Sequence, residues 1–158
     1  MAKKTTAKIG RKAPDFTLPA TGDKKINLRS LRGENVVLYF YPRDNTPGCT
    51  TEGQDFKALH RQFRRNKTLI LGISRDSIAA HEKFRDKFNF PFDLISDGDE
   101  IACKAYDVIK EKNMYGKKVI GIERSTFLID ASGTLKKEWR KVKVKGHADE
   151  VLAALKAL

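Results

Sequence analysis

The sequence predicts a single α/β domain in which a central mixed β-sheet is flanked by helices. Strand-like apolar runs alternate with amphipathic helical patterns, which is typical of parallel strands joined by crossover helices. A hairpin pattern late in the chain adds antiparallel strands and makes the sheet mixed. The 158 residues are enough for one domain with its own hydrophobic core.

The N-terminal part divides into a tail and the start of the domain. Residues 1–12 are basic and polar, so we expect a flexible tail there, followed by one domain over 13–158. Extended segments at 13–18 and 25–28 flank the turn residues Thr21-Gly22-Asp23. This pattern predicts a small hairpin that extends the sheet.

Strands and helices alternate in the middle of the chain and end in a hairpin and a last helix. Continuous β-branched and aromatic runs predict strands buried on both faces. Apolar residues at helical spacing predict the helices between them. The predicted strands are 36–41, 68–74, 92–95, 125–129 and 135–144, and the predicted helices cover about 50–65, the segment capped by Asp76 or Ser77, a short piece at 101–106 and the C-terminal residues around 151–158.

The chain is strongly basic, with a formal net charge of +12. Contact with nucleic acid or another polyanion is one interpretation. A solvated basic surface is the other, and we favour it because no nucleic-acid-binding motif accompanies the charge. We therefore do not expect nucleic acid as a partner.

We expect a cytoplasmic protein without a membrane segment, metal or other cofactor. No stretch approaches the roughly 18 apolar residues of a membrane span, and the basic start lacks the apolar segment of a secretory signal. Two cysteines do not make a disulfide framework. The histidines His60, His81 and His147 are scattered, and no His/Cys cluster has the spacing of metal ligands.

The run Tyr39–Cys49 carries the clearest functional signal. The apolar strand pattern ends at Pro42, a turn follows, and Cys49 stands where a helix begins. A thiol at a helix N-terminus meets the positive end of the helix dipole and unpaired N–H groups, which favour the thiolate. Gly48 leaves room for close approach to the sulfur, and Thr46 supplies a hydroxyl. These residues indicate an activated nucleophile.

The motif Pro42-x-x-x-Thr46-x-x-Cys49 resembles the active-site signature of the peroxiredoxins. Asn45-Thr46-Pro47-Gly48-Cys49-Thr50 is similar to the bacterioferritin comigratory protein (PrxQ) branch of that family. The resemblance covers nearly the whole chain after the basic tail, and it implies a thioredoxin-like fold, in agreement with the predicted order of elements. Other similar segments are Ala13–Leu18, Leu71–Ser74 and Ile122–Asp130.

The resemblance also implies a role for each matched residue. Cys49 would be the peroxidatic thiolate, which attacks the peroxide O–O bond and becomes a sulfenic acid. Thr46 would hydrogen-bond the peroxide and hold the thiolate, and Gly48 would line the same substrate site. Arg124 would stabilise the thiolate and polarise the peroxide, since a guanidinium is always charged. Pro42 would shield the sulfur.

One departure from the family pattern bears on the catalytic cycle. Many members of the branch carry a resolving cysteine where this chain has Gln54, or in the next helix around 84–88, where it also has none. Cys103 is the remaining thiol, and its apolar neighbours favour a structural residue over a resolving one. We therefore expect a one-cysteine cycle resolved by glutathione, glutaredoxin or thioredoxin. A Cys49–Cys103 cycle with thioredoxin is the alternative.

These observations predict a thiol-dependent peroxidase for hydrogen peroxide and organic hydroperoxides, acting as a monomer or weak dimer. Local unwinding of the motif helix during the cycle is expected, eased by Gly53 because glycine weakens a helix interior. A thiol–disulfide oxidoreductase is disfavoured because the chain has no Cys-x-x-Cys pair. A basic nucleic-acid-binding protein with a redox-sensing thiol is a further alternative.

Overall fold

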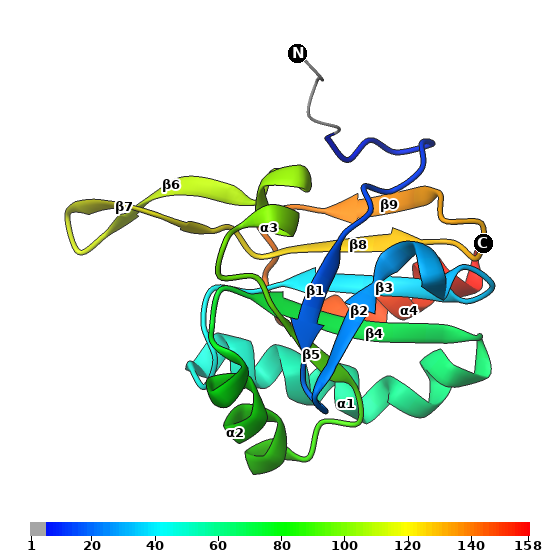
Figure 1. Cartoon of the computed structure of the whole chain (residues 1–158), viewed down its shortest axis with the longest axis horizontal. Coiled ribbons are helices and arrows are strands. Elements are labelled where there is room, and N and C mark those ends of the chain that lie inside the picture. The colour runs from blue at the N-terminus through cyan, green and yellow to red at the C-terminus, as the bar shows by residue number, and fades with distance from the viewer. Residues whose placement is uncertain (1–5) are drawn as a thin grey trace.

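Seven strands form one mixed sheet in the computed structural model of the protein, which describes residues 6–158 apart from the side chain of Met114 (Figure 1). The strand order is β2-β1-β5-β4-β3-β8-β9. The central strands β3, β4 and β5 run parallel, and the other neighbouring pairs run antiparallel. The strands are β1 (Thr17–Ala20), β2 (Lys24–Asn27), β3 (Asn35–Phe40), β4 (Thr68–Ser74), β5 (Asp93–Ser96), β8 (Ser125–Ile129) and β9 (Leu135–Trp139).

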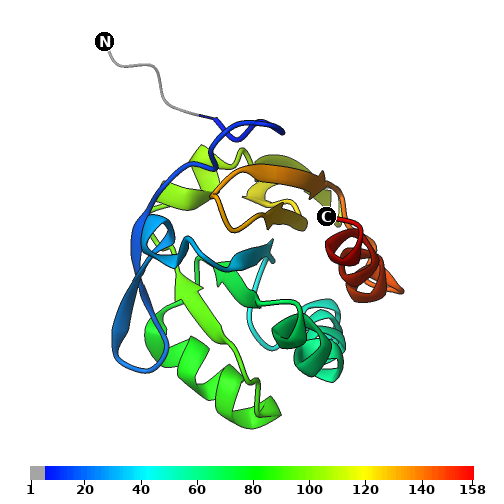
Figure 2. The same ribbon diagram turned by 90° about the vertical axis from the view of Figure 1, so that its right-hand side faces the viewer.

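Helices cover both faces of this sheet. The long helix α1 joins β3 to β4, and α2 joins β4 to β5; both pack on the same face as the C-terminal helix α4. Figure 2 shows α1 and α4 side by side on that face. The short helix α3 and the 3-10 turn η1 lie on the opposite face. Their bounds are η1 (Leu28–Leu31), α1 (Pro47–Arg65), α2 (Ile78–Phe88), α3 (Ile101–Ala105) and α4 (His147–Lys156).

The sheet separates two hydrophobic cores, and β3 contributes to both. Side chains alternate across a strand, so Val37 and Tyr39 pack toward α1 and α4, whereas Leu38 and Phe40 pack toward α3. All four are at most 1% exposed. This two-sided burial explains why the strand reads as a continuous apolar run, and it confirms the predicted central sheet.

The N-terminal segment packs more extensively than the sequence predicted. The expected hairpin is present, with β1 paired to both β2 and β5. Of the expected flexible tail, residues 1–5 lie outside the described residues, but later residues join the domain. Ala7 is buried and its N–H donates to the Ala105 carbonyl, and the N–H of Gly10 donates to the Leu135 carbonyl. The packed chain therefore begins before the predicted boundary at residue 13.

A second, two-stranded sheet was not predicted. Strands β6 (Ile109–Met114) and β7 (Lys117–Ile122) form an antiparallel hairpin that projects beyond the main sheet (Figure 1). Its two loop residues, Tyr115 and Gly116, both have positive φ, as a type I′ turn requires. The strands are rich in lysine and carry little apolar alternation, so the only local signal was Gly116 at the turn.

Several predicted boundaries move by a few residues. Helix α1 begins at Pro47 rather than near residue 50, and β9 ends at Trp139 rather than at 144. Ser77, one of the two predicted caps of α2, accepts a hydrogen bond from the Ala80 N–H. In the described part of the chain, no helix is both long and apolar enough to cross a membrane.

Candidate active site

Cys49 lies in the first turn of α1, as the sequence predicted. Pro47 is the first helical residue, where its missing N–H costs no hydrogen bond. Thr46 precedes it in an extended conformation, and its carbonyl accepts from the Thr50 N–H at 2.9 Å. The Cys49 side chain is buried, with 1% of its surface exposed. The thiol therefore sits at the positive end of a 19-residue helix.

Arg124 reaches the thiol because β8 pairs with β3. Phe40, the last residue of β3, lies opposite Ser125, the first residue of β8. This register brings Arg124 beside the start of α1, where its Nη2 donates to Cys49 Sγ at 3.4 Å. The guanidinium thus places a positive charge beside the sulfur.

Gly48 allows this approach. A Cβ atom at position 48 would lie 3.1 Å from Arg124 Nη2, closer than ordinary contact. The sequence predicted that Gly48 leaves space for a substrate at the sulfur. In the structure it is the guanidinium that uses this space.

Glu52 is a site residue that the sequence analysis missed. It is 1% exposed, and Arg124 Nη1 donates to its Oε1 at 2.6 Å. Burial raises the pKa of Glu52 to about 7, although Arg124 acts in the opposite direction. Its position three residues after Cys49, on the same face of a helix, was the available signal. Arg124 therefore bridges a buried carboxyl group and the thiol.

The hydroxyl of Thr46 forms a hydrogen bond within its own loop. Its Oγ1 donates to the Arg43 carbonyl at 2.9 Å, within the loop between β3 and α1. Pro42 is half-buried in the same loop. The hydroxyl hydrogen of Thr46 is thus used within the loop. The hydroxyl oxygen can still accept a hydrogen bond from another donor.

A buried polar network anchors this loop to α2. Asp44 Oδ2 lies 2.6 Å from Nδ1 of His81, which is fully buried. The other carboxylate oxygen of Asp44, Oδ1, accepts a hydrogen bond from the Tyr41 hydroxyl at 2.7 Å. The backbone N–H of Asp44 donates to Asp76 Oδ2 at 2.9 Å. His81 Nε2 lies 3.0 Å from the Ile95 carbonyl. The sequence analysis treated His81 as one of three scattered histidines and missed this role.

The partners of His81 assign its protons. A backbone carbonyl only accepts, so Nε2 carries a hydrogen, and Nδ1 faces a carboxylate. Both ring nitrogens of His81 therefore face acceptor groups. The ligand atoms of Asp44, Asp76 and His81 lie within 4.8 Å of one another, but hydrogen bonds among themselves and to the loop already occupy them.

Cys103 lies apart from this site. It belongs to the core between the sheet and α3, whereas Cys49 belongs to the core on the opposite face. The Cys103 N–H donates to Asp97 Oδ2 at 2.7 Å. Burial, with the Asp97 carboxylate as a second cause, raises the pKa of the Cys103 thiol. Its surroundings are those of a neutral packing residue.

A model of the AhpC/TSA family matches residues 9–138, most of the chain. The chain belongs to the AhpC/TSA family. Peroxiredoxin Bcp of Xanthomonas campestris is 58% identical over 143 residues, which are 90% of this chain and 89% of that protein. Peroxiredoxin Bcp of Bacillus subtilis is 50% identical over 151 residues, 96% of each chain.

Solved structures place this AhpC/TSA member in the same branch. A PrxQ mutant from Xylella fastidiosa superposes with a TM-score of 0.91 at 48% identity, over 97% of this chain and 98% of that one. The Xanthomonas campestris bacterioferritin comigratory protein gives 0.89 at 54% identity, over 95% and 98%. The protein is thus a peroxiredoxin of the Bcp/PrxQ type, a thiol-dependent peroxidase with a thioredoxin-like fold, as the sequence predicted.

Proposed function

We propose that Cys49 is the peroxidatic residue of this thiol peroxidase. The supporting observation is the Arg124 guanidinium 3.4 Å from Cys49 Sγ, at the start of α1. The thiolate attacks one peroxide oxygen and the O–O bond breaks. The sulfur gains that oxygen as a sulfenic acid, and the other oxygen takes up a proton and leaves as water or an alcohol.

The surrounding residues have separate roles in this reaction. Arg124 stabilises the thiolate and the negative charge that develops on the leaving oxygen. Thr46 accepts the hydrogen of the bound hydroperoxide, since its own hydrogen is directed to the loop. Gly48 keeps the helix start free of a side chain, and Pro42 limits access of water to the sulfur.

We propose hydrogen peroxide and organic hydroperoxides as the substrates. The related Xanthomonas protein was studied structurally for its alkyl peroxide reduction activity. That protein shares 54% of its residues with this chain over nearly the full length of both. The attack on the O–O bond is the same for both classes, and only the leaving group differs.

We further propose that an external thiol resolves the sulfenic acid. Cys49 and Cys103 are free cysteines on opposite faces of the central sheet. A disulfide requires Cα atoms within about 7 Å, so pairing them would demand disruption of the sheet or of α3. Glutathione, glutaredoxin or thioredoxin is therefore the reductant class, and the reducing cytoplasm that supplies it is the compartment we propose.

Turnover assays of matched cysteine variants test the catalytic assignment. With peroxide and dithiothreitol, Cys49→Ser should lose peroxide consumption by at least about a thousandfold, because a hydroxyl is not ionised at neutral pH. Cys103→Ala, the control, should keep it. Equal activity of wild type and Cys49→Ser would refute the assignment.

Intact mass spectrometry after one equivalent of peroxide tests the resolving step. We expect a gain of one oxygen on wild-type protein, and a mixed disulfide after glutathione is added. An internal disulfide that disappears in Cys103→Ala would establish the two-cysteine cycle instead.

A further inference from the structure

The β6–β7 hairpin turns one of its two faces toward the active site. Residues directly opposite each other in an antiparallel pair project to the same face. Lys112 is opposite Val119, and Lys110 is opposite Gly121, so these positions share one face. Lys117, at the tip, belongs to the same face because it is opposite Met114. The charged residues of this face are all basic.

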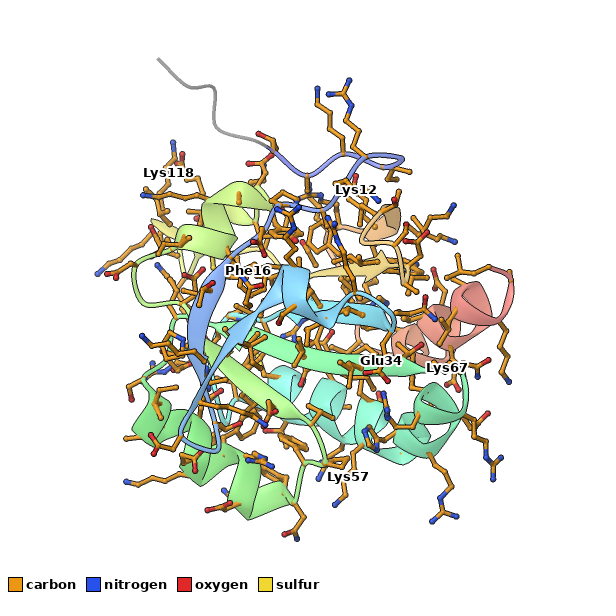
Figure 3. The ribbon with its side chains drawn as sticks, turned by 45° about the vertical axis from the view of Figure 1, so that its right-hand side comes forward. Lys12, Phe16, Glu34, Lys57, Lys67 and Lys118 are labelled. Atoms are coloured by element: carbon orange, nitrogen blue, oxygen red, sulfur yellow. The ribbon has the colours of Figure 1, made fainter. Side chains whose placement is uncertain are left out.

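The hairpin's acidic residue lies on the other face. Glu111 is opposite Ile120 there, and it forms an ion pair with Lys118 at 3.6 Å. Ile109 and Ile122, at the base of this second face, pack against the core on the α3 side. Figure 3 shows Lys118 at the periphery of the molecule. The two faces therefore differ in charge as well as in direction.

Two observations place the basic face near the thiol. Burial and the nearby Arg124 lower the pKa of Lys112, while Cys49 acts on it in the opposite direction. Strand β7 leads directly to Arg124, and the hairpin projects at the end of the sheet where β3 ends and α1 begins (Figure 1).

Two exposed large apolar residues accompany the basic face: Val119, which lies on it and is 38% exposed, and Tyr115 at the turn, which is 100% exposed. Ile120, which is 68% exposed, lies on the other face. Among the described residues, Lys112 and Lys117 form no ion pair, whereas Lys110 pairs with Asp107 at 3.1 Å. Apolar groups beside unpaired like charges are typical of a surface that receives a partner of opposite charge.

We propose that this basic face, Lys110, Lys112, Lys117 and Val119, docks an acidic thiol protein that reduces Cys49. This inference rests on the proposed function and names the partner of its second half-reaction. The groove on the other side of the α1 start is of mixed charge, because Asp55, Asp149 and Lys145 all line it, and its two carboxylates disfavour an acidic partner. The hairpin side is therefore the electrostatically favoured approach.

Docking serves a defined chemical step. A thiolate of the partner attacks Cys49 Sγ of the sulfenic acid, the S–O bond breaks, and the oxygen leaves as water with one added proton. A second thiol of the partner then attacks the partner's sulfur atom in the mixed disulfide. The partner thereby forms an internal disulfide, and Cys49 is released as a thiolate. Because Cys49 is 1% exposed, the partner reaches the sulfur through the predicted unwinding of the α1 start, and holding the partner beside the site would raise the rate of the first attack.

Charge reversal at the hairpin tip tests the docking face. We expect Lys117→Glu to lower kcat/KM for an acidic thioredoxin by roughly fivefold at low salt, with a weaker dependence on ionic strength, because rim charges act on association. Lys25→Glu, on the exposed edge strand β2, makes the same charge change away from the site and should have little effect. Turnover with dithiothreitol and single-turnover oxidation by peroxide should match wild type in both variants.

The same measurements separate the possible failures. If Lys117→Glu and Lys25→Glu have equal effects, the docking face is refuted. Turnover with dithiothreitol would still support the peroxidase assignment in that case. Absence of turnover with every thiol would overturn the proposed function itself. A dimer in light scattering that Lys117→Glu dissociates would assign the face to a second copy of this chain and refute the proposal.

Discussion

The guanidinium of Arg124 contacts two buried groups at once. It therefore connects the Glu52 carboxyl group to the Cys49 thiol. Its Nη1 is 2.6 Å from Glu52 Oε1 and its Nη2 is 3.4 Å from Cys49 Sγ. The second oxygen of Glu52 is buried without a partner among the described residues. Such a group costs free energy when ionised, which is why burial dominates its pKa.

The raised pKa of Glu52 predicts a specific pH dependence of stability. Between its ordinary value of 4.5 and about 7, the folded protein holds a proton that the unfolded chain releases, so the free energy of unfolding falls as pH rises. The contribution is on the order of 3 kcal/mol. Urea unfolding at pH 4.5 and 7.5 should show wild type losing stability relative to Glu52→Gln as pH rises, because the opposite contribution of His147, whose pKa is lowered to about 4, is common to both proteins. A stability difference that is the same at both pH values would contradict it.

Among the elements, the loop between β3 and α1 and the helix α2 depend on each other. The loop carries Pro42 and Thr46, and the pair formed by Asp44 and His81 holds it against α2. Lys87, near the end of α2, adds a hydrogen bond to Asn45 Oδ1 at 3.2 Å. A rigid helix thereby positions the residues that precede the nucleophile.

Breaking this pair should affect both stability and catalysis. We expect His81→Leu to lower the free energy of unfolding by about 3 kcal/mol, because it leaves a buried carboxylate unpaired. It should also lower kcat/KM for peroxide, since the loop loses its anchor. The double variant Asp44→Asn/His81→Leu should lose less than the sum of the single changes. Additive losses in the cycle would show that the two residues act independently.

The packing of α1 alters the expected role of Gly53. A Cβ at this position would lie 2.5 Å from Phe90 Cζ, so glycine is required for the close contact between α1 and that ring. Glycine still lowers the cost of unwinding. The two effects are compatible, because the contact exists only while the helix is wound, and unwinding during the cycle stays a prediction.

For the molecule as a whole, the packed part of the chain begins before residue 13, the boundary predicted from the composition. The hydrogen bonds of Ala7 and Gly10 tie the first described residues to α3 and β9. A chain that begins at residue 13 should therefore unfold more easily than one that begins at residue 6, by about 1–3 kcal/mol. Thermal or urea unfolding of the two chains measures the difference. Equal stability would show that this segment contributes nothing.

Basic side chains lie on several sides of the molecule. Figure 3 shows Lys12, Lys57, Lys67 and Lys118 on different sides of the molecule. This arrangement supports the solvated-surface interpretation of the net charge of +12. On the hairpin, the exposed side chains of Tyr115 and Val119 accompany the lysines of the basic face.

The sequence by itself determined the features that depend on local pattern. The run 36–41 predicted a strand buried on both faces, the alternation of elements predicted the mixed sheet, and Pro47 and Cys49 marked the helix start. The spacing of Pro42, Thr46 and Cys49 indicated the family. These signals are readable because propensity, periodicity and motif spacing act over a few residues.

Only the tertiary structure decided which distant groups meet. The register of β3 against β8 brings Arg124 to a thiol 75 positions earlier, and burial turns Glu52 into its second partner. The sheet separates Cys49 from Cys103, and a type I′ turn creates the lysine-rich hairpin. Such pairings depend on strand order and burial, which arise from the packing of the whole chain. They therefore produce no recognisable motif spacing in the sequence.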